Sequence, residues 1–432
     1  MEQIAFVLFA GAVIFVASKA FYKIYRNIML GKSETIKGNL NAMILVALGQ
    51  QKMFKRPVAA LLHVVIYVSF VITQIELIEI GIDGVFGTHR FIYHLWENSP
   101  ILESLYVFTI SFIEILTLLT LFVTIAFLWR RNLLKLPRFT KPELKGWPTK
   151  DANIILIMEL FLITNIFLMN ISDMAYADGK YGFFLSGLIS PLFASTDKGL
   201  LHILFKIGWC GHLAGVSGFL VYLSYSKHLH IMLAFPNTYF TKDNAKGYIA
   251  NMPEVTKEVK LMLDPNAAVD TDPNTAPAKF GAKDVFDLSW KNLLDAYTCT
   301  ECGRCTAQCP ANLTGKLLSP RKIMMDTRDR LEEVGKAIDA NKGEWKDDGK
   351  SLIENGYISV EELRACTTCN ACVEECPVNI SPLDIIVQLR RSLIMEDSNS
   401  PAEWNGMFSN LENNGAPWQF SQQDRLNWAK EG

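Results

Sequence analysis

The sequence predicts an all-α protein in two parts: five membrane-crossing helices, then a mostly helical domain with two runs of cysteines. Half of the 432 residues are hydrophobic, and they are concentrated before about residue 235. The rest of the chain is rich in charges, turns and amphipathic segments. A net charge of -2 is too small to indicate a nucleic-acid partner.

Five long apolar runs come first, each near the ~20 residues that cross a bilayer. No small-residue cleavage site follows the first run, which favours a spanning helix over a removed signal peptide. Five such runs joined by short loops also argue against a buried soluble core. The predicted spans are Ile4 to Tyr22, Pro57 to Ile80, Ser104 to Trp129, Asn153 to Ile171 and Leu200 to Ser224.

Basic residues in the loops predict the orientation. Seven lie between spans one and two and seven between spans three and four, whereas the other two loops contain only Arg90, Lys180 and Lys198. Lysine and arginine mark cytoplasmic loops. We therefore expect a multi-pass protein of the cell inner (cytoplasmic) membrane, with its amino terminus outside and its cysteine domain in the cytoplasm. Cysteines in that reducing compartment serve as metal ligands more often than as disulfides.

The domain boundaries follow from composition. We expect residues 1–240 to form the membrane domain, 241–284 a linker and 285–432 the cysteine domain. The stretch from Asp264 to Lys279 is rich in Asp, Pro, Asn and Ala, which favours an irregular connection.

Both cysteine runs have the pattern C-x2-C-x2-C-x3-C-P. Such spacing wraps three thiolates around one 4Fe-4S cluster, while the fourth cysteine ligates the other cluster. Structural zinc usually takes two separated C-x2-C pairs instead. The ninth cysteine, Cys210, reads as a small buried core residue. We assign Cys299, Cys302, Cys305 and Cys376 to one 4Fe-4S cluster, and Cys366, Cys369, Cys372 and Cys309 to a second.

The segments around these runs predict helices. Ser319 followed by Pro320 is a cap and first-turn signal, with apolar residues at helical spacing to Ile338. Ser381 and Pro382 open another helix that runs to about Met395.

The cysteine domain resembles a known family. The sequences "WKNLLDAYTCTECGRCTAQCPANLTGKLLSP" and "ACTTCNACVEECPVNISPLDIIVQLRR" are similar to those of iron-sulfur proteins related to the C subunit of heterodisulfide reductase, an α-helical ferredoxin. The resemblance implies two 4Fe-4S clusters. Many relatives continue into cysteine-rich CCG domains that reduce the substrate, so the resemblance implies a separate catalytic partner for this chain.

Histidines in the first part suggest haem, because neutral imidazole is the usual axial ligand of b-type haem and a polar ring in lipid is costly unless used. His212 and His230 are 18 residues apart, which is five turns of one helix, so we expect both on one side at different depths. We expect His63 at the depth of His230, so that these two share an inner haem.

The five-span layout and the sequence "HLHIMLAFPNTYF" resemble the gamma subunit of respiratory nitrate reductase, a dihaem cytochrome b that oxidises quinol. The resemblance implies one or two b-type haems. Thr73 stands where that family has a second ligand in span two, so His212 needs another partner. We favour His89, with His94 and His202 as alternatives.

Charged residues within the spans are costly in lipid and either pair or conduct protons. Quinol oxidation releases two protons that haem does not take. We expect one or two of these residues to relay them. The candidates are Glu76, Glu79, Glu114, Glu159 and Lys206.

The function that unites these features is membrane electron transfer. We expect electrons to pass between the (mena)quinone pool, b-type haem and the two clusters to a cytoplasmic CCG-domain (heterodisulfide-reductase-like) or flavoprotein subunit, in either direction. The chain is then an electron-transfer subunit of a quinone-linked oxidoreductase complex, with no catalytic residue of its own assigned. The alternatives are a membrane-anchored iron-sulfur redox sensor and a non-redox membrane anchor.

Overall fold

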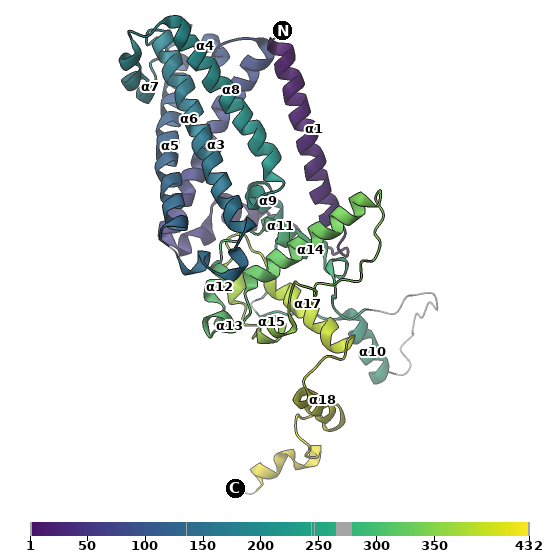
Figure 1. The fold of residues 1–432 in the computed structure, drawn as a ribbon. Helices are drawn as coiled ribbons and strands as arrows, with labels where there is room; N and C mark the ends of the chain where they lie inside the picture. The colour runs from purple at the N-terminus through teal and green to yellow at the C-terminus, as the bar shows by residue number, and fades with distance from the viewer. Residues whose placement is uncertain (1, 135, 243, 246, 265–278, 431–432) are drawn as a thin grey trace.

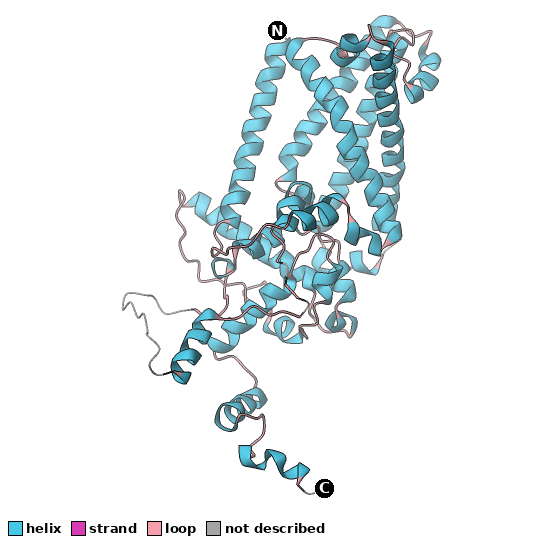
Figure 2. Cartoon of the chain, turned by 180° about the vertical axis from the view of Figure 1, so that it is seen from behind, coloured by secondary structure: helices cyan, strands magenta, loops and turns pink. Residues whose placement is uncertain are grey.

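The computed structural model describes residues 2–134, 136–242, 244–245, 247–264 and 279–430. Within these ranges the secondary structure is helical, and extended pairing is limited to isolated bridges between Lys32 and Ser289 and between Ile353 and Ile358. The predicted all-α fold is confirmed, and Figure 2 shows its two parts joined end to end.

Five long helices run the length of the first part (Figure 1). All five are long and apolar enough to cross a membrane, as the sequence predicted. Large apolar side chains such as Leu8 (69% exposed) and Phe122 (60% exposed) point outward, which suits a lipid surround. The helices are α1 (Glu2–Ile28), α3 (Pro57–Phe86), α5 (Pro100–Asn132), α6 (Trp147–Tyr176) and α8 (Lys198–Leu223).

Helices α6 and α8 form the closest pair in the bundle. A Cβ on Gly208 would lie 2.6 Å from the backbone nitrogen of Met169, and one on Gly211 would meet the Asn165 side chain. Small residues let two membrane helices approach closely and gain packing contacts. Cys210, on the same helix, is exposed on the bundle surface, so the prediction of a buried core cysteine was wrong.

Short elements close both ends of the bundle. The amino-terminal end of the bundle carries α4 (Phe91–Trp96), α7 (Phe184–Ile189) and η5 (Ser190–Phe193). The opposite end carries α2 (Leu40–Ala42), η1 (Met43–Leu48), η2 (Gln51–Lys55), η3 (Pro137–Phe139), η4 (Pro142–Leu144), η6 (Lys227–Leu229) and α9 (His230–Tyr239).

The second part is built from shorter helices. Ser319 caps α14 by accepting from the Lys322 backbone N–H, and Ser381 caps α17 in the same way, so both predicted helix starts are confirmed. The described part of this region contains η7 (Val285–Asp287), α11 (Trp290–Thr298), α12 (Arg304–Gln308), α13 (Pro310–Leu313), α14 (Pro320–Ala340), α15 (Val360–Ala365), α16 (Ala371–Glu375), α17 (Pro382–Met395), α18 (Ala402–Asn414) and η8 (Gln422–Ala429).

Among its described residues, the predicted linker contains one helix, α10 (Pro253–Leu263). The stretch from Asp264 to Lys279, which we expected to be irregular, lies outside the described residues except at its two ends.

The second part packs against one end of the bundle (Figure 1). Its hydrophobic core continues into Ile24 and Ile28 of α1. The Lys32 N–H donates to the Leu288 carbonyl at 2.7 Å, and the Trp290 N–H donates to the Lys32 carbonyl at 3.1 Å. The chain segments that carry the predicted basic loops therefore lie at the same end as the cysteine domain.

Candidate functional site

The two cysteine runs adopt the same local backbone. Glu301 and Thr368, at equivalent places, both have positive φ (56° and 55°), and so do Gly303 (73°) and Asn370 (66°). The left-handed turns at Gly303 and Asn370 lead into the short helices α12 and α16. Each run thereby wraps back on itself before its fourth cysteine ends the helix, which turns the thiols of one run toward a common space.

Four predicted ligands of one cluster line the first cavity, Cys299, Cys302, Cys305 and Cys376, and Cys372 lines it too. Three of the four come from the first run and Cys376 from the end of the second. The Ile380 N–H donates to the Cys376 sulfur at 3.3 Å. Such N–H···S bonds orient a sulfur ligand and tune its cluster.

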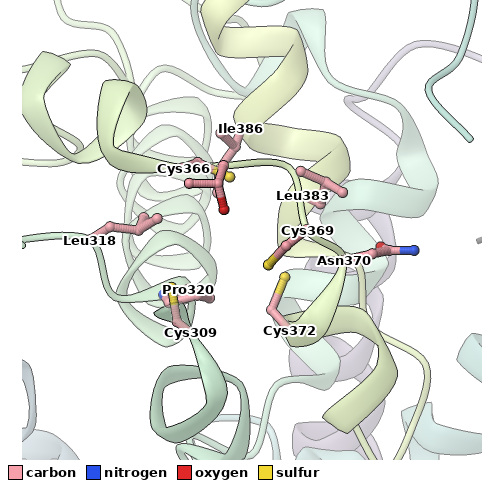
Figure 3. A pocket seen from close by; sticks show the side chains of 10 residues that line it. Cys309, Leu318, Pro320, Cys366, Cys369, Asn370, Cys372, Leu383 and Ile386 are labelled. Carbon is pink, nitrogen blue, oxygen red and sulfur yellow. The ribbon is translucent and has the colours of Figure 1, made fainter. Parts of the chain in front are cut away.

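The second cavity is lined by Cys309 of the first run and by the other three cysteines of the second, Cys366, Cys369 and Cys372. Figure 3 shows these thiols around one space, with Leu318, Leu383 and Ile386 as apolar walls. The fourth cysteine of each run thus lies with the first three of the other, which is the arrangement that a crossed dicluster requires.

The donor set fits 4Fe-4S clusters. Each cavity is lined by the four cysteines predicted for one cluster, whereas among the described residues no three Cys, His, Asp or Glu side chains gather closely enough to hold a single metal ion. Burial raises the pKa of the Cys299 thiol to about 11 and that of the Cys376 thiol to about 12. These two thiols are therefore protonated at neutral pH when free, and iron bound there would stabilise their thiolates.

The cavities differ in their surroundings. Beside the first cavity, the Arg304 guanidinium donates to the Lys52 carbonyl of the bundle at 3.3 Å, and Arg321 donates to the Arg138 carbonyl at 2.7 Å. In the second cavity Cys369 is exposed at the surface. The first cavity therefore faces the bundle, and the second opens to solvent.

The structure brings His63 and His230 together at this end of the bundle. Their ring centroids are 6.5 Å apart. Metal–nitrogen bonds are about 2 Å long, so this separation would leave room for one metal ion between the two rings. His63 Nδ1 is buried without a hydrogen-bond partner. His230 Nδ1 lies 3.1 Å from the Lys227 carbonyl, which leaves Nε2 free. Burial lowers the pKa of His230, which favours the neutral, ligating form.

His212 and His230 do not share a helix, so that prediction was wrong. Helix α8 ends at Leu223, and α9 begins at His230 after the turn η6. The Ser226 hydroxyl accepts from the His228 N–H and starts this new turn. His212, on α8, lies with Nδ1 3.4 Å from the Leu162 carbonyl of α6.

His89, the residue that we favoured as the partner of His212, contacts other groups. His89 Nε2 is 3.0 Å from Asp173, and its Nδ1 is 3.2 Å from the Tyr181 hydroxyl. Both ring nitrogens are therefore bonded to protein groups at the opposite end of the bundle from His63 and His230.

Sequence reasoning missed an ionic connection between the two sites. Glu301, within the first cysteine run, accepts from Lys227 at 2.5 Å and from Arg328 at 2.8 Å. Lys227 precedes His230 by one helical turn and also approaches Asp151 at 3.8 Å. Glu301 occupies a variable position of the cysteine motif, so nothing in the motif indicates its partner.

The cysteine domain matches the model of a known protein family. Residues 291–381 match the family model of the 4Fe-4S dicluster domain. This region is a 4Fe-4S dicluster domain. The match and the eight cysteines support two 4Fe-4S clusters, and together with the five apolar helices they describe a membrane-anchored dicluster ferredoxin.

This chain is similar to two relatives over nearly its whole length. It is 27% identical over 94% of its length to the probable iron-sulfur-binding oxidoreductase FadF of Bacillus subtilis, covering 57% of that protein. It is 24% identical over 93% of its length to the EtfAB:quinone oxidoreductase of Syntrophomonas wolfei, covering 55% of that protein. The chain thus spans little more than half the length of these relatives.

The predicted resemblance to heterodisulfide reductase is also present. The chain is 33% identical over 24% of its length to the C subunit of the ferredoxin/F(420)H(2)-dependent CoB-CoM heterodisulfide reductase of Methanosarcina acetivorans, covering 49% of that protein. No solved structure matches the chain.

Proposed function

We propose that this chain is a membrane electron-transfer subunit that connects the quinone pool, through b-type haem and two 4Fe-4S clusters, with a soluble redox partner. The observation that carries the proposal is the position of the His63–His230 pair at the end of the bundle that the dicluster domain covers. Haem and clusters each supply one-electron redox chemistry. The chain would supply the ligands and their burial.

The proposed axial ligands of the haem are His63 and His230. The nitrate reductase gamma-like sequence around His230 supports this assignment, as does the free Nε2 of that ring. His212 remains a candidate ligand for a second haem. We leave His89 out of the ligand set, because Asp173 and Tyr181 engage both of its ring nitrogens.

The proposed ligands of the clusters follow the two cavities. Cys299, Cys302, Cys305 and Cys376 would hold the cluster nearer the bundle, and Cys309, Cys366, Cys369 and Cys372 the cluster nearer the surface. The exposed position of Cys369 supports the second cavity as the place where the soluble partner exchanges electrons.

The partner we favour is a flavoprotein, because one relative is named an EtfAB:quinone oxidoreductase. With a flavoprotein as the electron donor, electrons would enter at the second cavity and leave to (mena)quinone at the membrane. A CCG-domain protein of the heterodisulfide-reductase type is the second candidate, supported by the similarity to the Methanosarcina acetivorans reductase. The basic loops support a cytoplasmic position for the dicluster domain on the inner membrane.

The test uses purified, cofactor-loaded protein under anaerobic conditions. We expect menadiol to reduce haem and clusters, read by visible absorbance and electron paramagnetic resonance, and menadione to reoxidise the dithionite-reduced protein. A redox sensor would instead exchange electrons without catalysing turnover between menadiol and an artificial acceptor, and a non-redox anchor would carry no haem. Cofactors that neither menadiol reduces nor menadione oxidises would contradict the proposal.

A further inference from the structure

A second polar centre lies at the end of the bundle away from the dicluster domain. Arg90, between α3 and α4, is only 4% exposed. Asp83 fixes it there by accepting from the backbone N–H groups of Arg90 at 2.9 Å and Phe91 at 3.1 Å. The guanidinium inserts among α3, α5 and α6, with the Phe183 ring centroid at 5.0 Å. A buried cation in such a place requires carboxylate partners.

Three carboxyl groups surround this guanidinium. Its Nη1 lies 3.3 Å from Glu76 and 3.8 Å from Glu79, and its Nε lies 3.0 Å from Asp173. Each of the three is 2% exposed. One positive charge therefore faces three acids in a buried site, where uncompensated negative charge is costly. A proton on one carboxyl relieves that cost.

The three acids are not equivalent. Glu79 accepts from the Tyr106 hydroxyl at 2.6 Å and from the Ile92 N–H at 3.0 Å, and Asp173 accepts from Arg90 and pairs with His89. Each oxygen of these two groups thus has a partner. Glu76 receives one donor, Arg90, on Oε1, whereas its Oε2 is buried without a partner. Glu76 is therefore the member best placed to take up and release a proton.

Other polar groups near Glu76 are already engaged. Glu114 of α5 accepts from the Leu185 N–H at 2.8 Å and from Ser186. On the α1 side, a Cβ on Gly84 would meet Phe6 and one on Gly87 would meet Gln3, and neither of these side chains titrates. These groups leave Arg90 and Asp173 as the connection from Glu76 toward the surface.

His89 completes the connection to water. It is 42% exposed, and its Nε2 is 3.0 Å from Asp173, which shares the Arg90 guanidinium with Glu76. An imidazole takes up and releases protons near neutral pH. Arginine stays protonated and positions the two acids. The network thus extends from a fully buried carboxyl to a half-exposed imidazole.

From these contacts we propose that Glu76, Asp173 and His89 form a proton path that serves the quinone chemistry, with Glu76 as its buried end. This inference rests on the proposed function. Oxidation of one quinol gives one quinone, two electrons and two protons; the electrons go to the haem and clusters, and the protons go through Glu76 to the end of the bundle opposite the clusters. Reduction of quinone draws both protons inward along the same groups. Charge then separates across the membrane during turnover.

The test measures the rate at which menadiol reduces the haem in the full-length, cofactor-loaded protein, as a function of pH. We expect Glu76→Gln to slow this rate roughly 100-fold, the usual contribution of a positioned proton acceptor. Its pH dependence should flatten, and Glu76→Asp should restore part of the rate. The control is Glu97→Gln, a carboxyl at the same end that pairs with His94 and Lys180 outside the network and should keep the wild-type rate.

Dithionite-reduced spectra report whether each variant keeps its cofactors. If Glu76→Gln loses its cofactors, His89→Gln takes its place in the test. His89→Gln should slow the rate of haem reduction at least about tenfold. The proton path would be overturned if cofactor-loaded Glu76→Gln, or His89→Gln in its place, had the wild-type rate and pH profile. The electron-transfer proposal would stand in that case. Wild-type protein that menadiol does not reduce would overturn both.

Discussion

The dicluster domain and the membrane bundle assemble their proposed ligand sets in different ways. In the dicluster domain three of the four cysteines around each cavity come from one short loop, with left-handed turns at Gly303 and Asn370 repeated in both runs. In the bundle, His63 comes from the start of α3 and His230 from α9, a separate helix after the last span. Local spacing therefore specifies the first kind of site, and packing of distant segments specifies the second.

The two ends of the bundle also differ in how their buried carboxyl groups are paired with cations. Beside the dicluster domain, Glu301 is neutralised by the two cations Lys227 and Arg328. At the far end a single cation, Arg90, serves three acids. The first arrangement holds two parts of the protein together, whereas the second leaves a carboxyl oxygen without a partner.

The largest effect is expected from removing one cysteine of the dicluster domain, whose sites depend on local spacing. Cys309→Ser should remove the cluster of the second run, because Cys309 lines the cavity of Cys366. Iron content should fall from about eight to about four atoms. Cys309→Ser and Cys366→Ser should leave the same paramagnetic resonance spectrum, distinct from that of Cys299→Ser. Cys210→Ser, exposed on α8, is the control. A spectrum of Cys309→Ser that equals that of Cys299→Ser would refute the crossed arrangement.

The next prediction addresses the site that depends on packing. His63→Leu should abolish the absorbance of the proposed inner haem, because His230 would be the one ligand of the pair that remains. Visible spectra of the purified variant measure this loss. His94→Leu, an exposed histidine at the other end, should have no effect. An unchanged haem spectrum in His63→Leu would show that another residue serves as the ligand.

The connection between the two parts can be broken at Glu301. Glu301→Gln removes the charge that Lys227 and Arg328 share, and because both Lys227 (10%) and Glu301 (3%) are nearly buried, the cost should be about 3–5 kcal/mol. Urea unfolding followed by tryptophan fluorescence measures it. The control is Glu333→Gln, a half-exposed carboxyl on α14. Equal stability of the two variants would mean that the Glu301 ion pairs add no net stability to the junction.

That apolar and backbone contact is tested at Gly31. A Cβ there would lie 2.7 Å from the Trp290 nitrogen and 2.9 Å from the Leu288 carbonyl oxygen, so Gly31→Ala should destabilise the junction by about 1–3 kcal/mol. Gly11→Ala, where nothing lies within 4 Å, is the matched control. Hydrogen exchange of residues 288–298 gives the measurement, and protection equal to that of the control would contradict the close approach.

The smallest effect should come from the exposed ion pair between Lys55 and Glu374, which are 37% and 46% exposed. Lys55→Ala should cost at most about 1 kcal/mol, because water and salt screen surface pairs. The difference from wild type in the same urea experiment should shrink further at high salt. A loss comparable to that of Glu301→Gln would place Lys55 among the groups that fix the domains.

Much of the fold was predictable from sequence, because apolar run length and capping residues act locally. The five long helices appear where the apolar runs lie, and α14 and α17 begin after Ser319 and Ser381. The break in the helix between His212 and His230 was not predictable from their spacing. Ser226 starts a new turn, and Lys227, held by Glu301 and the Pro148 carbonyl, redirects the chain before His230.

By itself the sequence determined the all-α class, the five apolar helices and the identity of the dicluster domain, since each depends on periodicity or spacing over a few residues. Only the tertiary structure decided that Cys369 is exposed while Arg304 contacts the bundle, and that His230 lies on α9, apart from the helix of His212. It also decided that Arg90 gathers three acids from two helices. Burial makes these contacts strong, and burial depends on how distant segments pack.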